Sequence, residues 1–565
     1  MTVNQLLPLL HQYEQTLAAL GKLQFRAHLA VPLMIDRDQS QALLRQNNRL
    51  MFQFQQLRLR RAKYLAQLLM LSNLDRTIWG KLQRLKAISQ ASTAQLQRIQ
   101  PVNRQRKINR LKQLIVNLQN EKIEESTVLV NQILAAIYQR HPTRLQPHFI
   151  NRPAPVTDLM TSRAFKLDLM ELNYLDVYFT IDELKQYVAF LIFKYTGQNV
   201  AGVIYYDART ILPNAQACGF SAVAYRFMLN GQSMCFISYK GTEGTMEDPR
   251  IDQFRQRFDN YVRENYQDWK YNIDAMLIGN SDNDDQLQLA RRFTRYLVRR
   301  MQKIDPATKI YGLGHSLGGH FVQTLQLLDR PFDAGFTLNA APIQLKQIKH
   351  YRPDLFDAAT WQQLFELTKQ DAQKAPTAQL IRAKIGSFDE IQNEWFVKDL
   401  TRIYFGFPYT FYIGTAQYSQ AKHWRYPFVA DITTYLNQTD MALYSQFWHN
   451  LIHHLQRVEK HNGTIMMASL LTYGLLALRE VYGVIKTPQA IAVFNDFARY
   501  LCDAKIFKGT PVAVQAHFEK ELSRPRTALE VLKGEWPFLS SVNHEMVETV
   551  IYCHTISGAK YFKIK

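Results

Sequence analysis

One short segment, residues 309–320, constrains the fold of this 565-residue chain more than any other. Its sequence, KIYGLGHSLGGH, joins an apolar run to a helix-like stretch through the pattern G-x-S-x-G. Between a strand and a helix this pattern forms a nucleophile elbow, a turn so tight that only small residues fit two positions before and after the serine. The elbow would expose the hydroxyl of Ser316 at the top of a sheet, where the strand before it ends. Its other members would be Gly314, His315, Gly318 and Gly319.

Strands and helices alternate around this elbow. Apolar runs predict strands over residues 200–206, 220–229, 234–239, 309–313, 335–339 and 379–386. Helical periodicity predicts helices over residues 285–304 and 320–328, and Asn230-Gly231 is typical of a hairpin turn. Such alternation implies a mostly parallel sheet with helices on both faces. We therefore expect an α/β domain over residues 151–430.

The two flanking regions have the texture of helices. Residues 1–150 are rich in glutamine and poor in glycine, and apolar residues recur there at helical spacing, as in Ile108, Leu111, Ile115 and Leu118. Four prolines between residues 141 and 155 disfavour helix and mark a linker. The predicted organisation is an all-α domain over residues 1–150, the α/β domain, and an all-α region over residues 431–565.

The net charge of +20 is concentrated in the N-terminal region. Residues 1–150 hold 22 Lys and Arg against 7 Asp and Glu, which leaves a charge of +5 for the rest of the chain. A field of this sign suits an anionic membrane surface, an acidic protein or nucleic acid. Nucleic acid is the least favoured partner, because apolar residues rather than exposed aromatics interrupt the basic runs and no nucleic-acid-binding fold is recognisable. A solvated helical face is the alternative that needs no partner.

Nothing in the sequence indicates a signal peptide, a membrane span or a metal site. The first residues lack a basic segment followed by an apolar core. The longest apolar stretch, residues 464–478, is shorter than the roughly 20 residues that span a bilayer. The four cysteines lie far apart without a CxxC pair, so neither a disulfide framework nor a zinc site is expected. We expect a protein without a cofactor, either cytoplasmic or exported by a route that needs no signal peptide.

Several segments of the α/β region resemble one known family. The sequence GHSLGG at residues 314–319 is similar to the elbow of the class 3 lipases, a family of α/β-hydrolases. Residues 219–225 and 237–242 resemble the family's strand pair and its Phe-Arg-Gly-Thr loop, with Tyr-Lys in place of Phe-Arg. Asp268-Trp269 resembles the segment that follows this loop. The resemblance covers about residues 200–425 and implies an α/β-hydrolase domain with serine esterase or lipase activity.

The resemblance also implies roles for residues beside the elbow. Thr242 would supply one donor of the oxyanion hole through its backbone N–H, and the amide of Leu317 would supply the other. The alternative for Gly241-Thr242 is a simple turn that ends a strand. Residues 243–267 form a charged insertion where family members carry a lid, and this insertion either covers the site or lies on the surface.

A catalytic serine needs a base, and the base needs a carboxylate to orient it. In α/β-hydrolases the chain order is serine, acid, histidine, and the acid follows a late strand. Asp389 comes directly after the strand expected over residues 379–386, so it is the predicted acid. Glu390 and Asp399 are the next candidates.

The histidine is expected in the loop after the next strand. Residues 409–414 have the pattern of that strand, and the first histidine beyond it is His423, the predicted base. Three rivals, His449, His453 and His454, fall in a helical run where histidines more often lie on the surface.

Together these residues predict a serine esterase or lipase that hydrolyses carboxylic esters of lipids, either acylglycerols or phospholipids. His423 would deprotonate Ser316 during its attack on the ester carbonyl. The sequence contains no Walker A loop, dinucleotide fingerprint, H-E-x-x-H or EF-hand loop, so no other enzyme class competes. The alternative is an α/β scaffold that has lost its activity and whose basic helices bind an acidic partner or nucleic acid.

Overall fold

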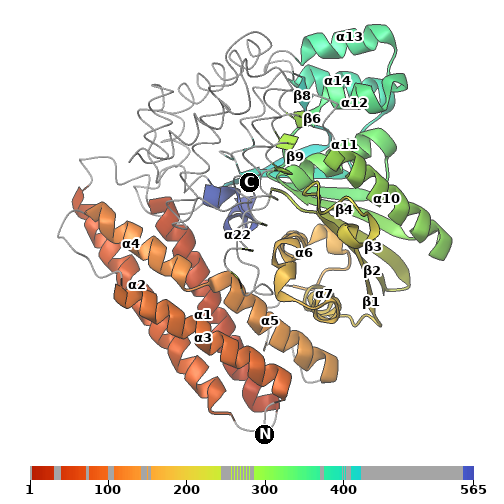
Figure 1. Cartoon of the computed structure of the whole chain (residues 1–565). Helices are drawn as coiled ribbons and strands as arrows, with labels where there is room; N and C mark the ends of the chain where they lie inside the picture. Colours follow the sequence, from red (N-terminus) through yellow and green to blue (C-terminus); the bar gives the residue numbers. More distant parts are fainter. Residues whose placement is uncertain are drawn as a thin grey trace.

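The computed structural model describes residues 3–30, 40–71, 75–98, 107–141, 154–242, 285–368, 374–396, 409–420 and 551–564, and isolated positions such as Asp399 and Thr401. Its centre is an eight-stranded sheet in the order β1-β2-β3-β4-β5-β7-β9-β10 (Figure 1). These strands are β1 (Val203–Asp207), β2 (Ala222–Leu229), β3 (Gln232–Tyr239), β4 (Lys309–His315), β5 (Ala334–Leu338), β7 (Ile391–Phe396), β9 (Thr415–Gln420) and β10 (Lys563–Ile564). A separate small sheet pairs β6 (Ile343–Gln344) with β8 (Thr410–Phe411).

The middle of the sheet is parallel and its two edges are antiparallel. Strands β3, β4, β5, β7 and β9 run parallel to one another. At one edge β1 and β2 form an antiparallel meander with β3, and at the other edge β10 pairs antiparallel with β9. Asn230 and Gly231 turn the chain between β2 and β3 with φ values of 52° and 77°, as a two-residue hairpin requires. The predicted α/β class and this hairpin are confirmed.

Crossover helices cover one face of the sheet. Helices α10 (Asp285–Ile304) and α11 (Leu317–Asp329) follow β3 and β4 in the chain. Since successive parallel strands are neighbours in the sheet, right-handed crossovers place these two helices on the same face. There Ile237 of β3 shares an apolar cluster with Phe293 of α10 and Phe321 of α11. A further cluster joins the far end of α11 to α12 (Leu345–Tyr351), α13 (Ala358–Leu367) and α14 (Lys374–Ile385).

Helices that precede β1 cover the opposite face. Helix α6 (Arg163–Leu175) and helix α7 (Ile181–Thr196) pack against the sheet with side chains such as Phe165, whose ring centre lies 5.5 Å from that of Phe236 in β3. Because α10 and α11 both lie on the first face, the second face needs cover from outside those crossovers. The segment before β1 supplies this cover and belongs to the core of the α/β fold.

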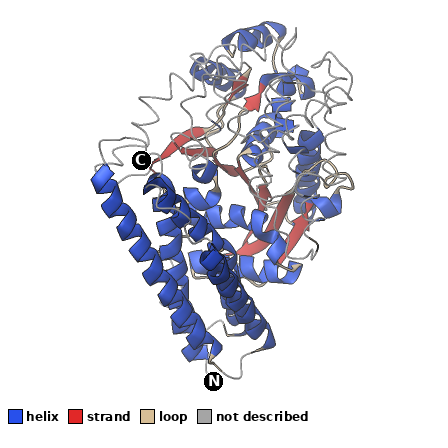
Figure 2. Ribbon diagram, turned by 60° about the vertical axis from the view of Figure 1, so that its left-hand side comes forward, coloured by secondary structure: helices blue, strands red, loops and turns tan. Residues whose placement is uncertain are grey.

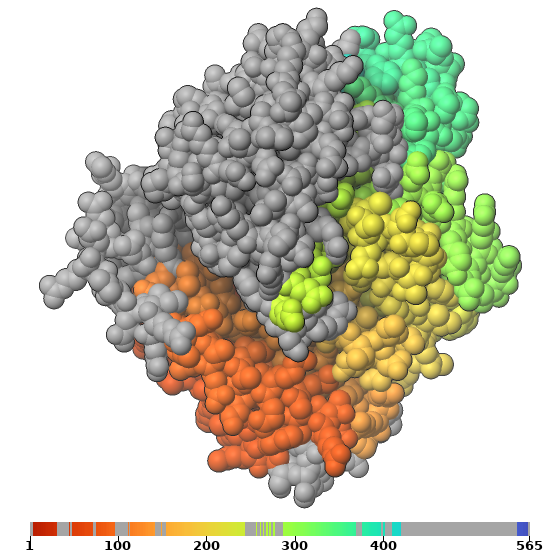
Figure 3. Space-filling view, in the orientation of Figure 1, coloured from red at the N-terminus to blue at the C-terminus, as the bar shows by residue number. Residues whose placement is uncertain are grey.

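Five long N-terminal helices form a bundle that packs against α7. Figure 2 shows this bundle as a group of long helices near the N-terminus. They are α1 (Val3–Ala30), α2 (Ser40–Leu69), α3 (Arg76–Arg98), α4 (Lys107–Asn120) and α5 (Ile123–Arg140). Ile133 of α5 lies in the same apolar cluster as Leu191 of α7 and Phe236 of β3. In the space-filling view the bundle surface continues into that of residues 154–242 (Figure 3). The predicted long amphipathic helices are confirmed, and they share a core with the sheet.

The prediction of a strand over residues 379–386 is wrong, because residues 379–385 belong to α14. Thr377 and Ile381 are buried and Ile385 is half-buried, so the covered positions recur every four residues, which is the spacing of a helix. The next strand of the central sheet is β7, which ends at Phe396. The end of the late strand therefore lies ten residues further along the chain than predicted, which matters for the acid.

The last described residues return to the sheet. Residues 551–554 are helical, α22 (Ile556–Ala559) follows, and Lys563 of β10 pairs with Gln420 of β9. The region predicted as all-α thus ends in a strand of the α/β sheet, whereas residues 421–550 and most of the predicted linker lie outside the described residues. Within the described part of the chain, none of the helices combines the length and the apolar character that a membrane crossing demands.

Candidate active site

Ser316 occupies a strained turn between β4 and α11. Its φ of 55° and ψ of −119° form a conformation that a non-glycine residue adopts only where its surroundings enforce it. The N–H of Ser316 donates to the carbonyl of Leu338 at 3.0 Å. Its own carbonyl accepts from the N–H groups of Gly319 and Ala341, each at 3.0 Å. These bonds hold the turn, and the predicted strand, turn and helix around Ser316 are present.

Close packing explains the three glycines of the elbow. A Cβ atom on Gly314 would overlap the carbonyl group of Gly318, and a Cβ atom on Gly318 would overlap the carbonyl group of Tyr239. A Cβ atom on Gly319 would lie 2.5 Å from that of Ala340. Any side chain at these positions would push α11 away from the sheet and distort the turn at the serine.

The loop after β3 passes directly beside the serine. A Cβ atom on Gly241 would lie 3.1 Å from the Cβ of Ser316. The hydroxyl of Thr242 accepts a hydrogen bond from the side-chain amide of Asn272 at 3.0 Å. Leu317 is the first residue of α11, where backbone N–H groups lack partners within the helix. The structure therefore brings both predicted oxyanion residues, Thr242 and Leu317, next to Ser316.

Asp389 lies at the wrong end of the sheet to act with Ser316. It precedes β7, and β7 runs parallel to β4 and β5. Asp389 therefore lies at the amino ends of these strands, whereas Ser316 lies at their carboxyl ends. The side chain of Asp389 is 54% exposed and pairs with Arg382 at 3.0 Å. Glu390 lies at the same end and accepts from the side-chain amide of Gln326 at 2.7 Å. The choice of Asp389 is therefore corrected, and the misassigned strand is the reason.

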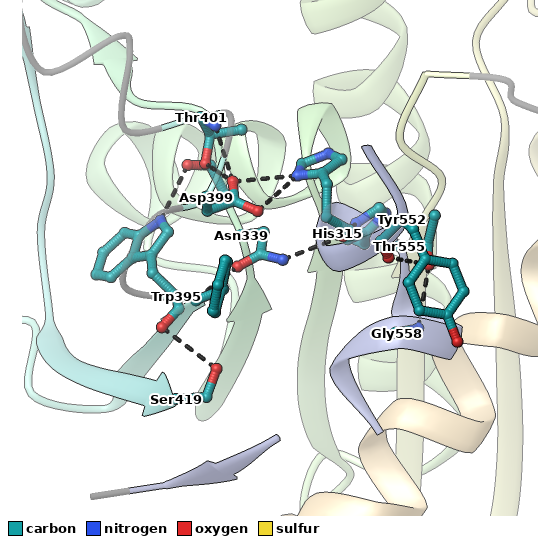
Figure 4. A network of polar contacts seen from close by, with 12 residues as sticks. His315, Asn339, Trp395, Asp399, Thr401, Ser419, Tyr552, Thr555 and Gly558 are labelled. Atoms are coloured by element: carbon teal, nitrogen blue, oxygen red, sulfur yellow. Dashed lines mark hydrogen bonds and ion pairs between the residues drawn. The ribbon is translucent and has the colours of Figure 1, made fainter. Parts of the chain in front are cut away.

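Asp399 lies at the same end of the sheet as Ser316, where the parallel strands have their carboxyl ends. It follows the end of β7 by three residues and is buried, with 1% of its surface exposed. Its carboxylate accepts hydrogen bonds from the backbone N–H and the hydroxyl of Thr401, at 2.8 and 2.6 Å (Figure 4). These two bonds fix the orientation of a buried carboxylate at the position where the acid of a catalytic triad is expected.

His554 is the histidine that meets this carboxylate. Its Nδ1 lies 2.9 and 3.1 Å from the two carboxylate oxygens of Asp399. Because Nδ1 faces the acid, Nε2 is the nitrogen left to exchange a proton with a hydroxyl group. The imidazole ring lies 4.8 Å from that of His315, the residue before Ser316. His423 and its rivals His449, His453 and His454 lie outside the described residues.

Two side chains hold the backbone of His554. Nε2 of His315 and Nδ2 of Asn339 both bond its carbonyl oxygen, at 2.8 and 3.0 Å (Figure 4). Asn339 follows β5 with a φ of 47°, and its side-chain oxygen accepts from the N–H of Phe396 at 2.8 Å. Residues at the ends of β4, β5 and β7 therefore set the position of the histidine.

A directional chain of hydrogen bonds connects the loop after β3 to His554. A carbonyl only accepts, so Nε2 of His315 carries the proton and Nδ1 is an acceptor. Tyr174 of α6 donates its hydroxyl to that Nδ1 at 2.9 Å, and its oxygen accepts from the N–H of Gly241 at 2.7 Å. Burial and the neighbouring His554 lower the pKa of His315 to about 3, so His315 stays neutral near pH 7. A neutral His315 is what this series of hydrogen bonds requires, because its Nδ1 must accept.

Charged residues of α6 anchor the segment that carries His554. Lys560 pairs with Asp168 at 2.7 Å and with Glu171 at 2.5 Å, and the hydroxyl of Ser557 donates to Glu171 at 3.0 Å. Burial opposes ionisation of Asp168, but Lys560 and Lys194 together lower its pKa to about 2. Because loss of either partner would leave a buried charge unpaired, these contacts fix α22 on α6.

The family comparison covers most of this site. Residues 165–405 match a family model described as a domain of unknown function (DUF6792). The matched region includes Tyr174, Ser316 and Asp399, and it ends before His554. No curated protein and no solved structure matches the chain.

Sequence reasoning missed His554 and Tyr174. His554 obeys the chain order of serine, acid and histidine. It follows Asp399 by 155 residues, however, far beyond the loop after the next strand in which the histidine is expected. Tyr174 lies 67 residues from Gly241 and 141 residues from His315, so it has no local signal. Among the residues that the structure describes, no group of three His, Cys, Asp or Glu side chains is placed to hold a metal ion.

Proposed function

We propose that the protein is a serine carboxylic ester hydrolase of the α/β type that acts on lipid esters, either acylglycerols or phospholipids. The observation that carries the proposal is the hydrogen-bonded pair of Asp399 and His554. This pair lies at the same end of the sheet as Ser316 on its strained turn. A serine after β4 and a buried carboxylate after β7, both at the carboxyl ends of parallel strands, together with a histidine bonded to the carboxylate, suit acyl transfer. The lipid substrate rests on the resemblance of residues 314–319 to the class 3 lipases.

In the first half-reaction, Nε2 of His554 takes the proton of the Ser316 hydroxyl as its oxygen attacks the ester carbonyl. Asp399 keeps the proton on Nδ1 and stabilises the imidazolium that forms. The N–H groups of Leu317 and Thr242 donate to the developing oxyanion. When the tetrahedral intermediate collapses, His554 returns the proton to the leaving alcohol and an acyl-serine remains.

In the second half-reaction, water replaces the alcohol. His554 takes a proton from this water as it attacks the acyl-serine, and the same N–H groups hold the second oxyanion. The carboxylic acid leaves and Ser316 regains its proton. Each step uses side chains and N–H groups of this chain, and the atoms balance to one ester and one water consumed for each acid and alcohol formed.

We expect a fluorophosphonate probe to label the wild-type protein and to leave Ser316→Ala unlabelled, because the probe reacts only with an activated hydroxyl. Hydrolysis of a short soluble ester should fall by about 10⁴- to 10⁶-fold in the same variant. Gel fluorescence and ester turnover measure the two effects. Ser92→Ala, a buried serine in the bundle that bonds Glu121, serves as the matched control and should retain labelling. Absence of labelling together with absence of turnover across an ester panel would falsify the proposal and favour an inactive scaffold.

Tyr174→Phe should lower kcat by about tenfold to a hundredfold with little change in KM. The phenyl ring keeps its edge contact with His315, whose ring centre lies 5.8 Å away, but the hydroxyl that joins Gly241 to His315 is lost. The N–H of Gly241 and Nδ1 of His315 then lose this partner, at a cost of about 1 to 3 kcal/mol each. The loop after β3, which carries Thr242, is no longer tied to His315. Steady-state kinetics on a soluble ester measure the split. Tyr205→Phe removes a hydroxyl from β1 and should leave kcat unchanged, and an equal loss in both variants would contradict a positioning role for Tyr174.

A further inference from the structure

A groove with an apolar floor and a cationic rim runs between α1 and α2. Its volume is about 340 Å³. The floor includes Ala19, Leu23 and Leu57, and the rim includes Lys22, Arg26 and Arg60. Among the described residues that line it, none is acidic. This combination fits a ligand that is both anionic and apolar.

An exposed apolar stripe on α2 adjoins the groove. Phe52 and Leu59 of α2 and Met70, directly after the end of α2, expose 58%, 72% and 83% of their surfaces. Phe52 and Leu59 are two helical turns apart and therefore share one face of α2, and Arg60 and Lys63 flank that face. Large apolar side chains held in water gain free energy when a partner covers them, at roughly 25 cal/mol for each Å².

The charge carried by the described helices around this face is almost wholly positive. Helices α1, α2 and α3 contain 13 Lys and Arg against a single acid, Glu14, which is buried. Elsewhere in the bundle, Glu121 already pairs with Arg58 and Arg61. Glu121 is thus committed to these two arginines, while Lys22 and Arg60 on the rim of the groove are both exposed.

We propose that this face, the α1–α2 groove with the adjoining stripe of α2, binds the surface of an anionic lipid membrane. The acyl region would take up Leu59 and its neighbours while lipid phosphates meet Lys22, Arg26 and Arg60. A nucleic acid would satisfy the same cations but would leave the apolar stripe in water. The purpose of the contact, to hold an esterase at its substrate, rests on the proposed function, whereas the binding itself does not need an active site.

The test measures sedimentation of the Ser316→Ala protein with vesicles, so that binding is read without hydrolysis. We expect binding to vesicles of phosphatidylcholine mixed with phosphatidylglycerol at low salt, with release as salt rises. Lys22→Gln and Arg60→Gln should each weaken binding about fivefold. Leu59→Ser should weaken it roughly tenfold, because it removes the exposed apolar contact and keeps the charge.

A matched variant separates this face from general electrostatic attraction. Arg299→Gln removes the same charge from an exposed position on α10, across the sheet, and should leave vesicle binding unchanged. An equal loss with Arg299→Gln, equal binding to pure phosphatidylcholine, or displacement from the vesicles by duplex DNA would each overturn the proposal. Ester turnover of the wild type is a separate measurement, so failure of the membrane site and failure of the proposed enzyme remain distinguishable.

Discussion

Replacement of His554 by alanine is expected to lower kcat/KM on a soluble ester by about 10⁴- to 10⁶-fold, as strongly as Ser316→Ala. The reason is that Nε2 of His554 is the only acceptor the proposal offers for the serine proton, since His315 is committed to its two hydrogen bonds. Labelling by the fluorophosphonate probe should disappear in parallel. The two readouts together test the base, because both need an activated hydroxyl.

The control for His554 is the histidine that local sequence favours. His423→Ala should retain nearly all turnover if His554 is the base. Because alanine at position 554 removes the imidazole that pairs with the buried carboxylate of Asp399, His554→Gln provides a second variant whose amide can still donate to that carboxylate. Urea unfolding of both variants reports folding separately from activity. Loss of turnover in His423→Ala, with full turnover in His554→Gln, would return the catalytic role to His423.

Asp399→Asn is expected to lower kcat by about 10⁴-fold, the loss that the same change produces in the triad of a serine protease. An asparagine keeps the size of the side chain but presents an amide to Nδ1 of His554 and favours the wrong tautomer of the imidazole. KM should change little, since Asp399 is buried behind the histidine. Steady-state kinetics on a soluble ester measure both constants.

Asp389→Asn is the natural comparison, because the same chemical change at the other end of β7 removes only an exposed pair with Arg382. Such a pair contributes about 0 to 1 kcal/mol to stability, so turnover should match the wild type. If Asp389→Asn lost activity and Asp399→Asn kept it, the assignment of the acid would be reversed.

The features predicted correctly from the sequence are those that nearby residues encode. The elbow at Ser316 follows from glycines two and three positions away, which the packing against Tyr239 and Ala340 requires. The hairpin at Asn230-Gly231 follows from two residues that tolerate a positive φ. In the same way, helix α10 was predictable to the residue, because its apolar positions recur at helical spacing over five turns.

Asp399 was predicted only as a reserve candidate for the acid, and His554 was not predicted at all, for two physical reasons. A short apolar run such as residues 379–386 suits a strand or a helix equally well, and burial on one side decided for a helix. His554 is held at the site by the pairing of β10 with β9 and by the ion pair between Lys560 and Asp168 of α6. No local sequence pattern indicates these contacts. The general lesson is that the elbow is a local structure, whereas the other two groups are placed by the tertiary fold.

The order of the catalytic groups along the chain has a consequence for synthesis. A ribosome that has reached residue 540 has produced Ser316, Asp399 and the oxyanion loop, but neither His554 nor the Lys560 and β10 contacts that hold it in place. The bundle proposed to bind membranes is translated before the sheet, and His554, the proposed base, is translated among the last residues described. If the proposed function holds, hydrolysis would begin only after that final segment has been made and has joined the sheet.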